Sequence, residues 1–229
     1  MPRTARASAG GVCYHVINRG NGRTEVFHKP QDYDAFVVML GEAAERVAVR
    51  VLAYCLMPNH FHLVLWPRKD GDLSRFMQWL LTAHVRRYHG HYHGSGHVWQ
   101  GRFKAFPIQQ DDHLLTVLRY VERNALRAGL TARAEGWAWS SARWWGRRRR
   151  PAFLHAGPVD RGPRWMALVN RAMTPAEEEA LRNSVNRGTP WGSPRWQKLV
   201  ATRLGLESTM RPRGRPRKRP AAHAKSREK

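Results

Sequence analysis

Two histidines separated by one residue are the part of this chain best suited to bind a metal ion. His60 and His62 lie on either side of Phe61, in an apolar run that ends at Trp66. Because successive side chains of a strand point to opposite faces, the two imidazoles would share one face and could hold one divalent ion. The pair alone is weak evidence, since the chain has 12 histidines and short motifs of this kind recur by chance.

A tyrosine and an asparagine supply a second pair of chemical groups. Tyr120 and Asn124 are four residues apart in a segment with helical periodicity, so both would lie on one face, one turn apart. A partly buried core tyrosine beside an exposed asparagine is the ordinary alternative. Together with paired imidazoles and a large positive charge, however, a phenol and an amide are the components of metal-assisted phosphoryl transfer.

The charge of the chain points to a polyanionic partner. Lysine and arginine number 40 against 17 aspartate and glutamate residues, which gives a formal net charge of +23, and nucleic acid is the usual partner of such a chain. Cys13 and Cys55 form no C-x-x-C pair, which argues against a disulfide framework and a thiolate zinc site. No apolar run approaches the ~18 residues of a membrane span, so the sequence predicts a cytoplasmic, nucleoid-associated protein without membrane contact.

The order of the expected elements predicts an α+β fold. Strands are expected at about 12–18, 51–57, 60–66 and 103–108, helices at about 32–47, 72–88 and 112–128, and loops at 89–97 and 160–164. This order favours a ferredoxin-like antiparallel sheet with its helices on one face. Beyond a main domain at 1–146, we expect accessory helices within 147–210, two of them starting near Thr174 and Ser193. A basic tail at 211–229 should be disordered alone.

Four separated motifs resemble those of the REP-associated tyrosine transposases, which belong to the single-tyrosine branch of the HUH endonucleases and are related to the IS200/IS605 transposases. The motifs stand in the family's order: YHVINRGNGR at 14–23, MPNHFH at 57–62, GHVWQGRF at 96–103 and YVERN at 120–124. The resemblance covers roughly residues 11–145 and implies that the main domain is an HUH endonuclease core.

The resemblance also implies roles for single residues. Tyr120 matches the nucleophile, His60 and His62 match the metal-binding histidines, and Asn124 matches a third metal ligand, where some related transposases have glutamine. The cofactor would be a divalent metal, Mg²⁺ or Mn²⁺. The enzyme would cut and rejoin single-stranded DNA beside REP-type hairpins, through a 5′ phosphate joined to the tyrosine.

Arginines near these motifs and in the tail are the candidate DNA contacts. Arg213 and Arg215 belong to an Arg-Gly-Arg-Pro segment that resembles the core of an AT-hook, although attraction to phosphates explains the charge equally well. The full set is Arg19, Arg23, Arg86, Arg102, Arg123, Arg127, Arg213 and Arg215.

Two other functions stay open at this point. A domesticated transposase could bind repeat hairpins as a regulator or architectural protein without cutting DNA, and intact His60, His62 and Tyr120 argue against this loss of catalysis without proving turnover. A replication-type HUH nickase is less attractive because of the compact single-tyrosine layout. A monomer and a homodimer are both compatible with the sequence.

Overall fold

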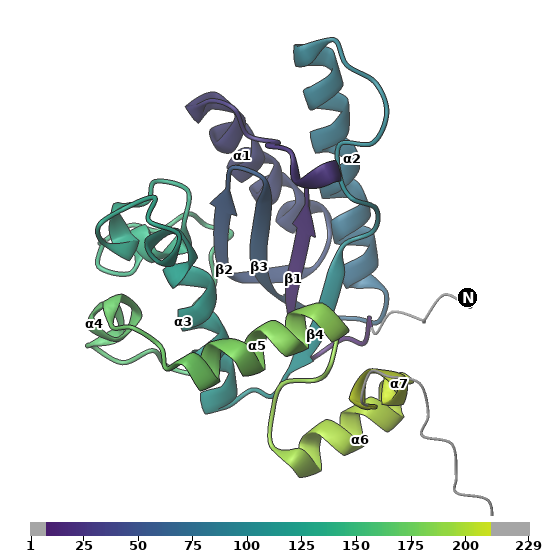
Figure 1. Cartoon of the computed structure of the whole chain (residues 1–229), viewed down its shortest axis with the longest axis vertical. Coiled ribbons are helices and arrows are strands. Elements are labelled where there is room, and N and C mark those ends of the chain that lie inside the picture. Colours follow the sequence, from purple (N-terminus) through teal and green to yellow (C-terminus); the bar gives the residue numbers. More distant parts are fainter. Residues whose placement is uncertain (1–7, 212–229) are drawn as a thin grey trace, which may run out of the picture.

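A four-stranded antiparallel sheet lies at the centre of the computed structural model, which describes residues 8–211 (Figure 1). The strands are β1 (Cys13–Arg19), β2 (Val49–Met57), β3 (His60–Pro67) and β4 (Lys104–Ile108). Their order across the sheet is β2-β3-β1-β4, so β1 lies between β3 and β4. The predicted α+β fold with an antiparallel sheet is therefore confirmed. The basic tail, with Arg213 and Arg215, lies outside the described residues.

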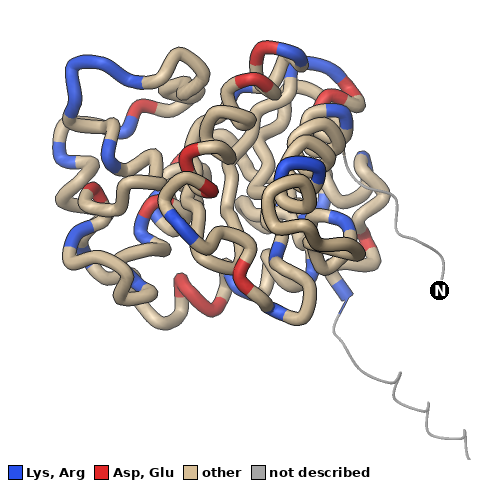
Figure 2. The backbone as a smooth tube through the Cα atoms, turned by 90° about the horizontal axis from the view of Figure 1, so that it is seen from above, with Lys and Arg blue, Asp and Glu red and all other residues tan. Residues whose placement is uncertain are grey.

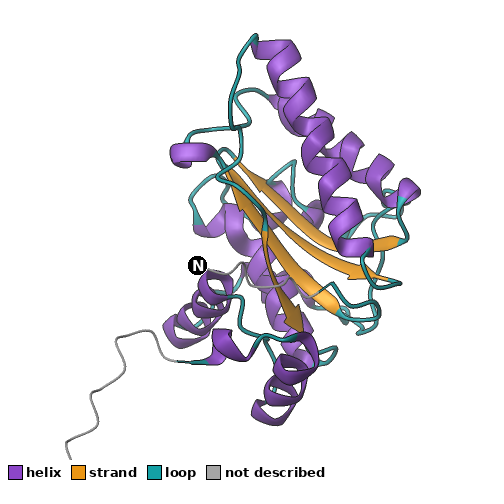
Figure 3. Ribbon diagram, turned by 90° about the vertical axis from the view of Figure 1, so that its right-hand side faces the viewer, coloured by secondary structure: helices purple, strands orange, loops and turns teal. Residues whose placement is uncertain are grey.

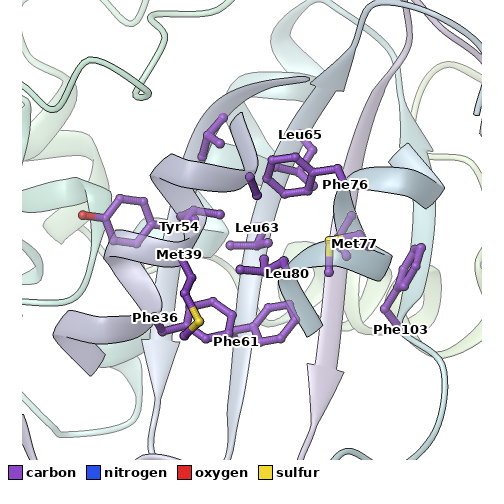
Figure 4. Close-up of a cluster of buried hydrophobic side chains, with 14 of the residues drawn as sticks. Phe36, Met39, Tyr54, Phe61, Leu63, Leu65, Phe76, Met77, Leu80 and Phe103 are labelled. Atoms are coloured by element: carbon purple, nitrogen blue, oxygen red, sulfur yellow. The ribbon is translucent and has the colours of Figure 1, made fainter. Parts of the chain in front are cut away.

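Helices α1 (Pro30–Arg46) and α2 (Asp72–Tyr92) cover one face of this sheet (Figure 3). Phe61 and Leu63 point to this face from β3, because alternate residues of a strand share a side. They pack in one fully buried cluster with Phe36 of α1 and Leu80 of α2 (Figure 4). This cluster fixes the strand that carries both histidines of the H-x-H pair.

The third helix, α3 (Asp112–Arg127), packs on the opposite face, so the prediction that all helices share one face is wrong. A second buried cluster joins Cys55 of β2 and Val64 of β3 to Val117 and Val121 of α3. The central strands thus carry apolar side chains on both faces, and both faces have to be removed from water. Helices on one side alone could not achieve this.

Short helices follow α3 along the chain. They are η2 (Ala134–Gly136), η3 (Ser141–Trp144), α4 (Trp165–Asn170), α5 (Pro175–Arg187), α6 (Pro194–Leu204) and α7 (Glu207–Met210), and η1 (Asn21–Arg23) follows β1. The two predicted accessory helices are α5, whose capping box pairs Thr174 with Glu177, and α6. Helix α4 was not predicted because its six residues are too few to show a helical period, and α2 extends to Tyr92 into the predicted loop. Within residues 8–211 no helix has the length and apolar character needed to span a membrane.

A buried carboxylate joins α3 to two of these short helices. Glu122 is fully buried, and its two oxygens accept hydrogen bonds from Ser141 Oγ at 2.8 Å, from Trp165 Nε1 at 2.7 Å and from Trp145 Nε1. Burial raises the pKa of Glu122, while the positive charge of Arg161 and these donors oppose the shift. The carboxylate of α3 therefore acts as the shared acceptor for two later chain segments, 141–145 and the start of α4.

Removing this acceptor should destabilise the fold. In Glu122→Ala three donors lose their partner, two of them buried and one partly buried, and we expect the free energy of unfolding to fall by about 3–5 kcal/mol. Glu122→Gln keeps one amide oxygen and should cost less. Urea unfolding followed by tryptophan fluorescence measures both variants, and an alanine variant as stable as the wild type would contradict this role.

Candidate active site

The two histidines of the H-x-H pair lie side by side on β3, on the face covered by α3. Their ring centroids are 5.1 Å apart. His62 is only 2% exposed, whereas His60, at the first position of the strand, is half-buried. The Nδ1 atom of His60 is held at 2.6 Å by Oδ1 of Asn59, in the hairpin turn. His60 is left with Nε2 as the nitrogen available to a ligand.

A third histidine, His15 of β1, contacts the pair from the neighbouring strand. Its Nε2 lies 2.8 Å from Nδ1 of His62, so one of these two nitrogens carries the shared proton. When His62 donates, its Nε2 is free to bind a metal, as histidine ligands do when their other nitrogen is held by a partner. His15 is fully buried and its Nδ1 has no hydrogen-bond partner among the described residues. The sequence alone indicated no role for His15.

All three imidazoles are neutral at physiological pH. Burial lowers the pKa of His60 to about 4 and that of His15 to about 3, and the pKa of His62 is lowered well below its ordinary value, chiefly by burial. The positive charges of Arg19 and Arg127 contribute to the shifts of His60 and His62. A neutral imidazole keeps the lone pair that a metal ion needs, so the pair is available as a ligand set.

Tyr120 faces this histidine cluster from α3. Its ring centroid is 5.8 Å from that of His62 and 6.3 Å from that of His15, and the side chain is 5% exposed. The guanidinium of Arg127 lies 5.7 Å from the centre of the phenol ring. Burial raises the pKa of Tyr120, and the positive charge of Arg127 opposes that shift. The phenol is therefore placed beside the imidazoles and next to a positive charge that favours its ionised form.

Asn124 lies one turn after the tyrosine and is fully buried. Its Nδ2 donates to the backbone oxygen of Tyr120 at 2.9 Å, and its Oδ1 accepts from Arg127 at 2.8 Å. A carboxamide oxygen has two lone pairs, so Oδ1 can accept from Arg127 and still offer a second pair. Residues 8–211 contain no cluster of three His, Cys, Asp or Glu side chains that could hold a metal. Two imidazoles with an amide oxygen nevertheless fit a divalent ion that keeps open positions for phosphate and water.

Two of the candidate DNA-binding arginines line a cavity that begins beside the histidines. Arg19 and Ile17 stand opposite His60 and His62 in the sheet. They line a cavity of about 300 Å³ together with Asn18, Gln100, Arg102, Lys104, Val185 and Asn186. Polar and basic residues make up most of its walls.

The other candidate arginines lie elsewhere. Arg86 lines a separate cavity of about 630 Å³ between α2 and the segment 96–103, to which Arg102 also contributes. Arg23 lies beside the hairpin turn, where its backbone oxygen accepts from Asn59. Arg123 donates to the backbone oxygen of Asn170, at the end of α4, instead of reaching the histidine cluster.

Helix α5 covers the tyrosine from the accessory region. Leu181 is fully buried against the α3 face of the sheet, and the charges of Arg182 and Glu178 act on the pKa of Tyr120. The sequence predicted this helix but not its place over the site. Its apolar Leu181 and Val185, four residues apart, are the signal that it docks.

Comparisons with known proteins agree with this architecture. The family model described as transposase, IS200-like, matches residues 8–124. A Haemophilus influenzae protein assigned as a REP-associated tyrosine transposase is 26% identical over 111 residues, which cover 44% of this chain and 62% of that protein. The chain thus matches about three fifths of that relative's length. A solved REP-associated tyrosine transposase bound to a REP hairpin shares the fold, with a TM-score of 0.52 and 19% identity over 76% of this chain and all of that one. The chain therefore belongs to the IS200-like transposase family.

Proposed function

We propose that this transposase is a metal-dependent single-stranded DNA endonuclease and strand transferase that acts at REP-type hairpins through a 5′-phosphotyrosine intermediate. The single observation that carries the proposal is the position of the Tyr120 phenol, 5.8 Å from His62 between ring centroids and on the same face as His60. The similarity to a transposase solved with a REP hairpin supports the choice of substrate.

The residues of the site divide the chemistry between them. Tyr120 Oη loses its proton and attacks the phosphorus, and the bond from phosphorus to the 3′ oxygen breaks. The departing 3′ oxygen takes one proton, which balances the proton lost by the phenol. Arg127 stabilises the phenolate before attack and negative charge on the phosphate during it. His60 and His62, with Asn124, would hold Mg²⁺ or Mn²⁺, which supplies electrostatic stabilisation of a non-bridging phosphate oxygen.

The reverse reaction makes the enzyme a strand transferase. Because the phosphotyrosine bond has an energy close to that of the phosphodiester it replaces, another 3′-hydroxyl can displace Oη and restore a DNA strand. His15 and Asn59 keep the imidazoles in place throughout, since each holds one Nδ1 atom. The chain thus needs no external energy source for rejoining.

Hairpin binding without cleavage is the second candidate function, and one observation favours it. Tyr120 is 5% exposed and shares a buried cluster with Leu181 of α5, so this helix limits the access of a phosphate to the phenol. A protein that kept α5 closed would bind hairpins and leave them intact, as a regulator or architectural protein would.

A covalent-adduct assay decides between the two functions. The full chain is mixed with hairpin-bearing single-stranded DNA from the flanks of its gene, labelled on the 3′ side of the expected cut, with Mn²⁺ or with EDTA. A labelled band that survives denaturation and needs Mn²⁺ supports the endonuclease. Tight hairpin binding with no adduct in Mg²⁺ or Mn²⁺ would support the binding protein instead.

A further inference from the structure

A large cavity lies outside the part of the chain matched by the family model. It has a volume of about 900 Å³, and its lining residues fall between Trp144 and Ala167. Three arginines of the run 147–150 line it, Arg147, Arg148 and Arg150. The run appears as a continuous blue stretch at the edge of the molecule (Figure 2). The activity proposed above assigns no role to this cavity.

Arginines on the rim of the cavity stack on tryptophan rings. The guanidinium of Arg147 lies 5.5 Å from the ring centre of Trp144, and that of Arg150 lies 4.7 Å from the ring centre of Trp145. Both indoles are anchored by their N–H groups, Trp144 on the hydroxyl of Tyr54 at 2.9 Å and Trp145 on the buried carboxylate of α3. The stacks therefore hold two guanidinium groups against fixed surfaces.

These two guanidinium groups keep their hydrogen-bond donors free. Arg147 and Arg150 are exposed, and within residues 8–211 neither side chain forms a hydrogen bond or an ion pair. Contact with an aromatic ring uses none of the N–H donors of a guanidinium, so these donors remain available to a ligand. That planar fork matches the oxygens of a phosphate, and a held guanidinium loses less entropy when it binds.

The charged side chains that line the cavity also favour an anionic ligand. Arg148, Arg161 and Arg164 line it together with the two stacked arginines, and Asp160 is the one acidic residue in the lining. Arg161 lies on Trp145, 3.8 Å from the ring centre, and donates to the backbone oxygen of Leu52. It completes the wall of the cavity.

The cavity lies across α3 from the proposed nucleophile. Glu122 accepts from Trp145 and Trp165 on one side of this helix, while Tyr120, two residues earlier, faces His62 on the other. Residues two apart project from nearly opposite sides of a helix, which is ~10–12 Å across with its side chains. The two sites are therefore separated by about the width of one helix, a distance that a DNA molecule bound at both would span.

We propose that Arg147 and Arg150, held on Trp144 and Trp145, form a clamp for the phosphodiester backbone of DNA. The ligand follows from the proposed function, in which DNA occupies the neighbouring active site. Because the indole faces are already occupied by guanidinium groups, the clamp contacts phosphates and reads no bases. Its contribution to binding is independent of sequence.

The test compares two double variants with equal loss of charge. Arg147→Gln with Arg150→Gln removes the clamp. The matched control, Arg149→Gln with Arg195→Gln, removes one arginine from the same run and one from α6, both exposed and neither lining the cavity. Fluorescence anisotropy without metal measures the dissociation constant from about 50 to 200 mM salt for a hairpin, its single-stranded flank and an unrelated duplex.

We expect the clamp variant to bind the hairpin roughly tenfold more weakly, with a salt slope lower by about 2, because each duplex phosphate contact contributes about 0.9. An equal effect on the unrelated duplex assigns the clamp to the stem, and an effect confined to the flank assigns it to the single strand. Equal losses in the clamp and control variants would overturn the proposal and leave only general charge attraction.

A lysine variant separates the clamp from charge alone. Arg147→Lys with Arg150→Lys keeps both charges but loses the planar fork, and we expect its affinity to lie between those of the wild type and the glutamine variant. Full affinity in the lysine variant would overturn the clamp. Binding to the unrelated duplex requires neither a REP hairpin nor cleavage. A failed clamp therefore shows in these binding measurements, whereas a failed function shows as a missing covalent adduct.

Discussion

Tyr120→Phe is expected to abolish the covalent adduct and lower cleavage by roughly 10⁴-fold or more, because it removes the atom that becomes bonded to phosphorus. Hairpin affinity should stay nearly unchanged. The Tyr120 hydroxyl forms no hydrogen bond to another residue within 8–211, so losing it leaves no buried group without a partner. Stability should accordingly change by less than about 1 kcal/mol. The readouts are the denaturation-resistant adduct, the dissociation constant and the urea midpoint, measured on one preparation.

A second tyrosine provides the control for this substitution. Tyr88 lies on α2, on the other face of the sheet, where its hydroxyl contacts Nε2 of His28 at 3.0 Å. Tyr88→Phe removes one hydroxyl far from the histidine cluster and should leave adduct formation intact. An adduct retained at the wild-type rate in Tyr120→Phe would exclude this phenol as the nucleophile and would transfer the assignment to another side chain.

The site in the main domain depends on the accessory region, because helix α5 of that region lies over Tyr120. Leu181 packs into the same buried cluster as Tyr120, and Ser184 beside it is 5% exposed. The family model ends at residue 124, so the cover on the tyrosine comes from outside the matched core. The boundary expected at residue 146 therefore marks a change of composition. The site itself includes residues before this boundary and residues of α5 after it.

The sequence predicted those parts of the fold that depend on local periodicity. Alternation along 60–66 placed His60 and His62 on one face, and the four-residue spacing of Tyr120 and Asn124 placed these on one side of a helix, as the structure has them. It did not predict which face α3 covers, because Cys55 and Val64 give the strands a second apolar face. That choice depends on packing between distant segments.

His15 was missed for a related reason. Its hydrogen bond to His62 joins residues 47 apart along the chain. His15 stands opposite Val64 in the register of β1 and β3, so its ring reaches His62 only diagonally. Neither the pairing of these strands nor their register follows from local pattern. The sequence did contain one signal, because histidines occur in two predicted strands, His15 in one and His60 and His62 in the other.

His62→Ala is expected to abolish metal-dependent cleavage and to weaken Mn²⁺ binding by at least 100-fold, because one of two imidazole ligands is lost. Calorimetric titration of Mn²⁺ into the protein without DNA measures binding apart from activity. His97→Ala removes an exposed histidine of the segment between α2 and β4 and is the control.

His15→Leu should give an intermediate loss of Mn²⁺ affinity of about 10–100-fold, the usual cost of removing the partner that orients a histidine ligand. Unchanged Mn²⁺ affinity in His62→Ala would contradict the metal site itself. A loss in His62→Ala but not in His15→Leu would show that burial alone, without the 2.8 Å contact between His15 and His62, orients the ligand.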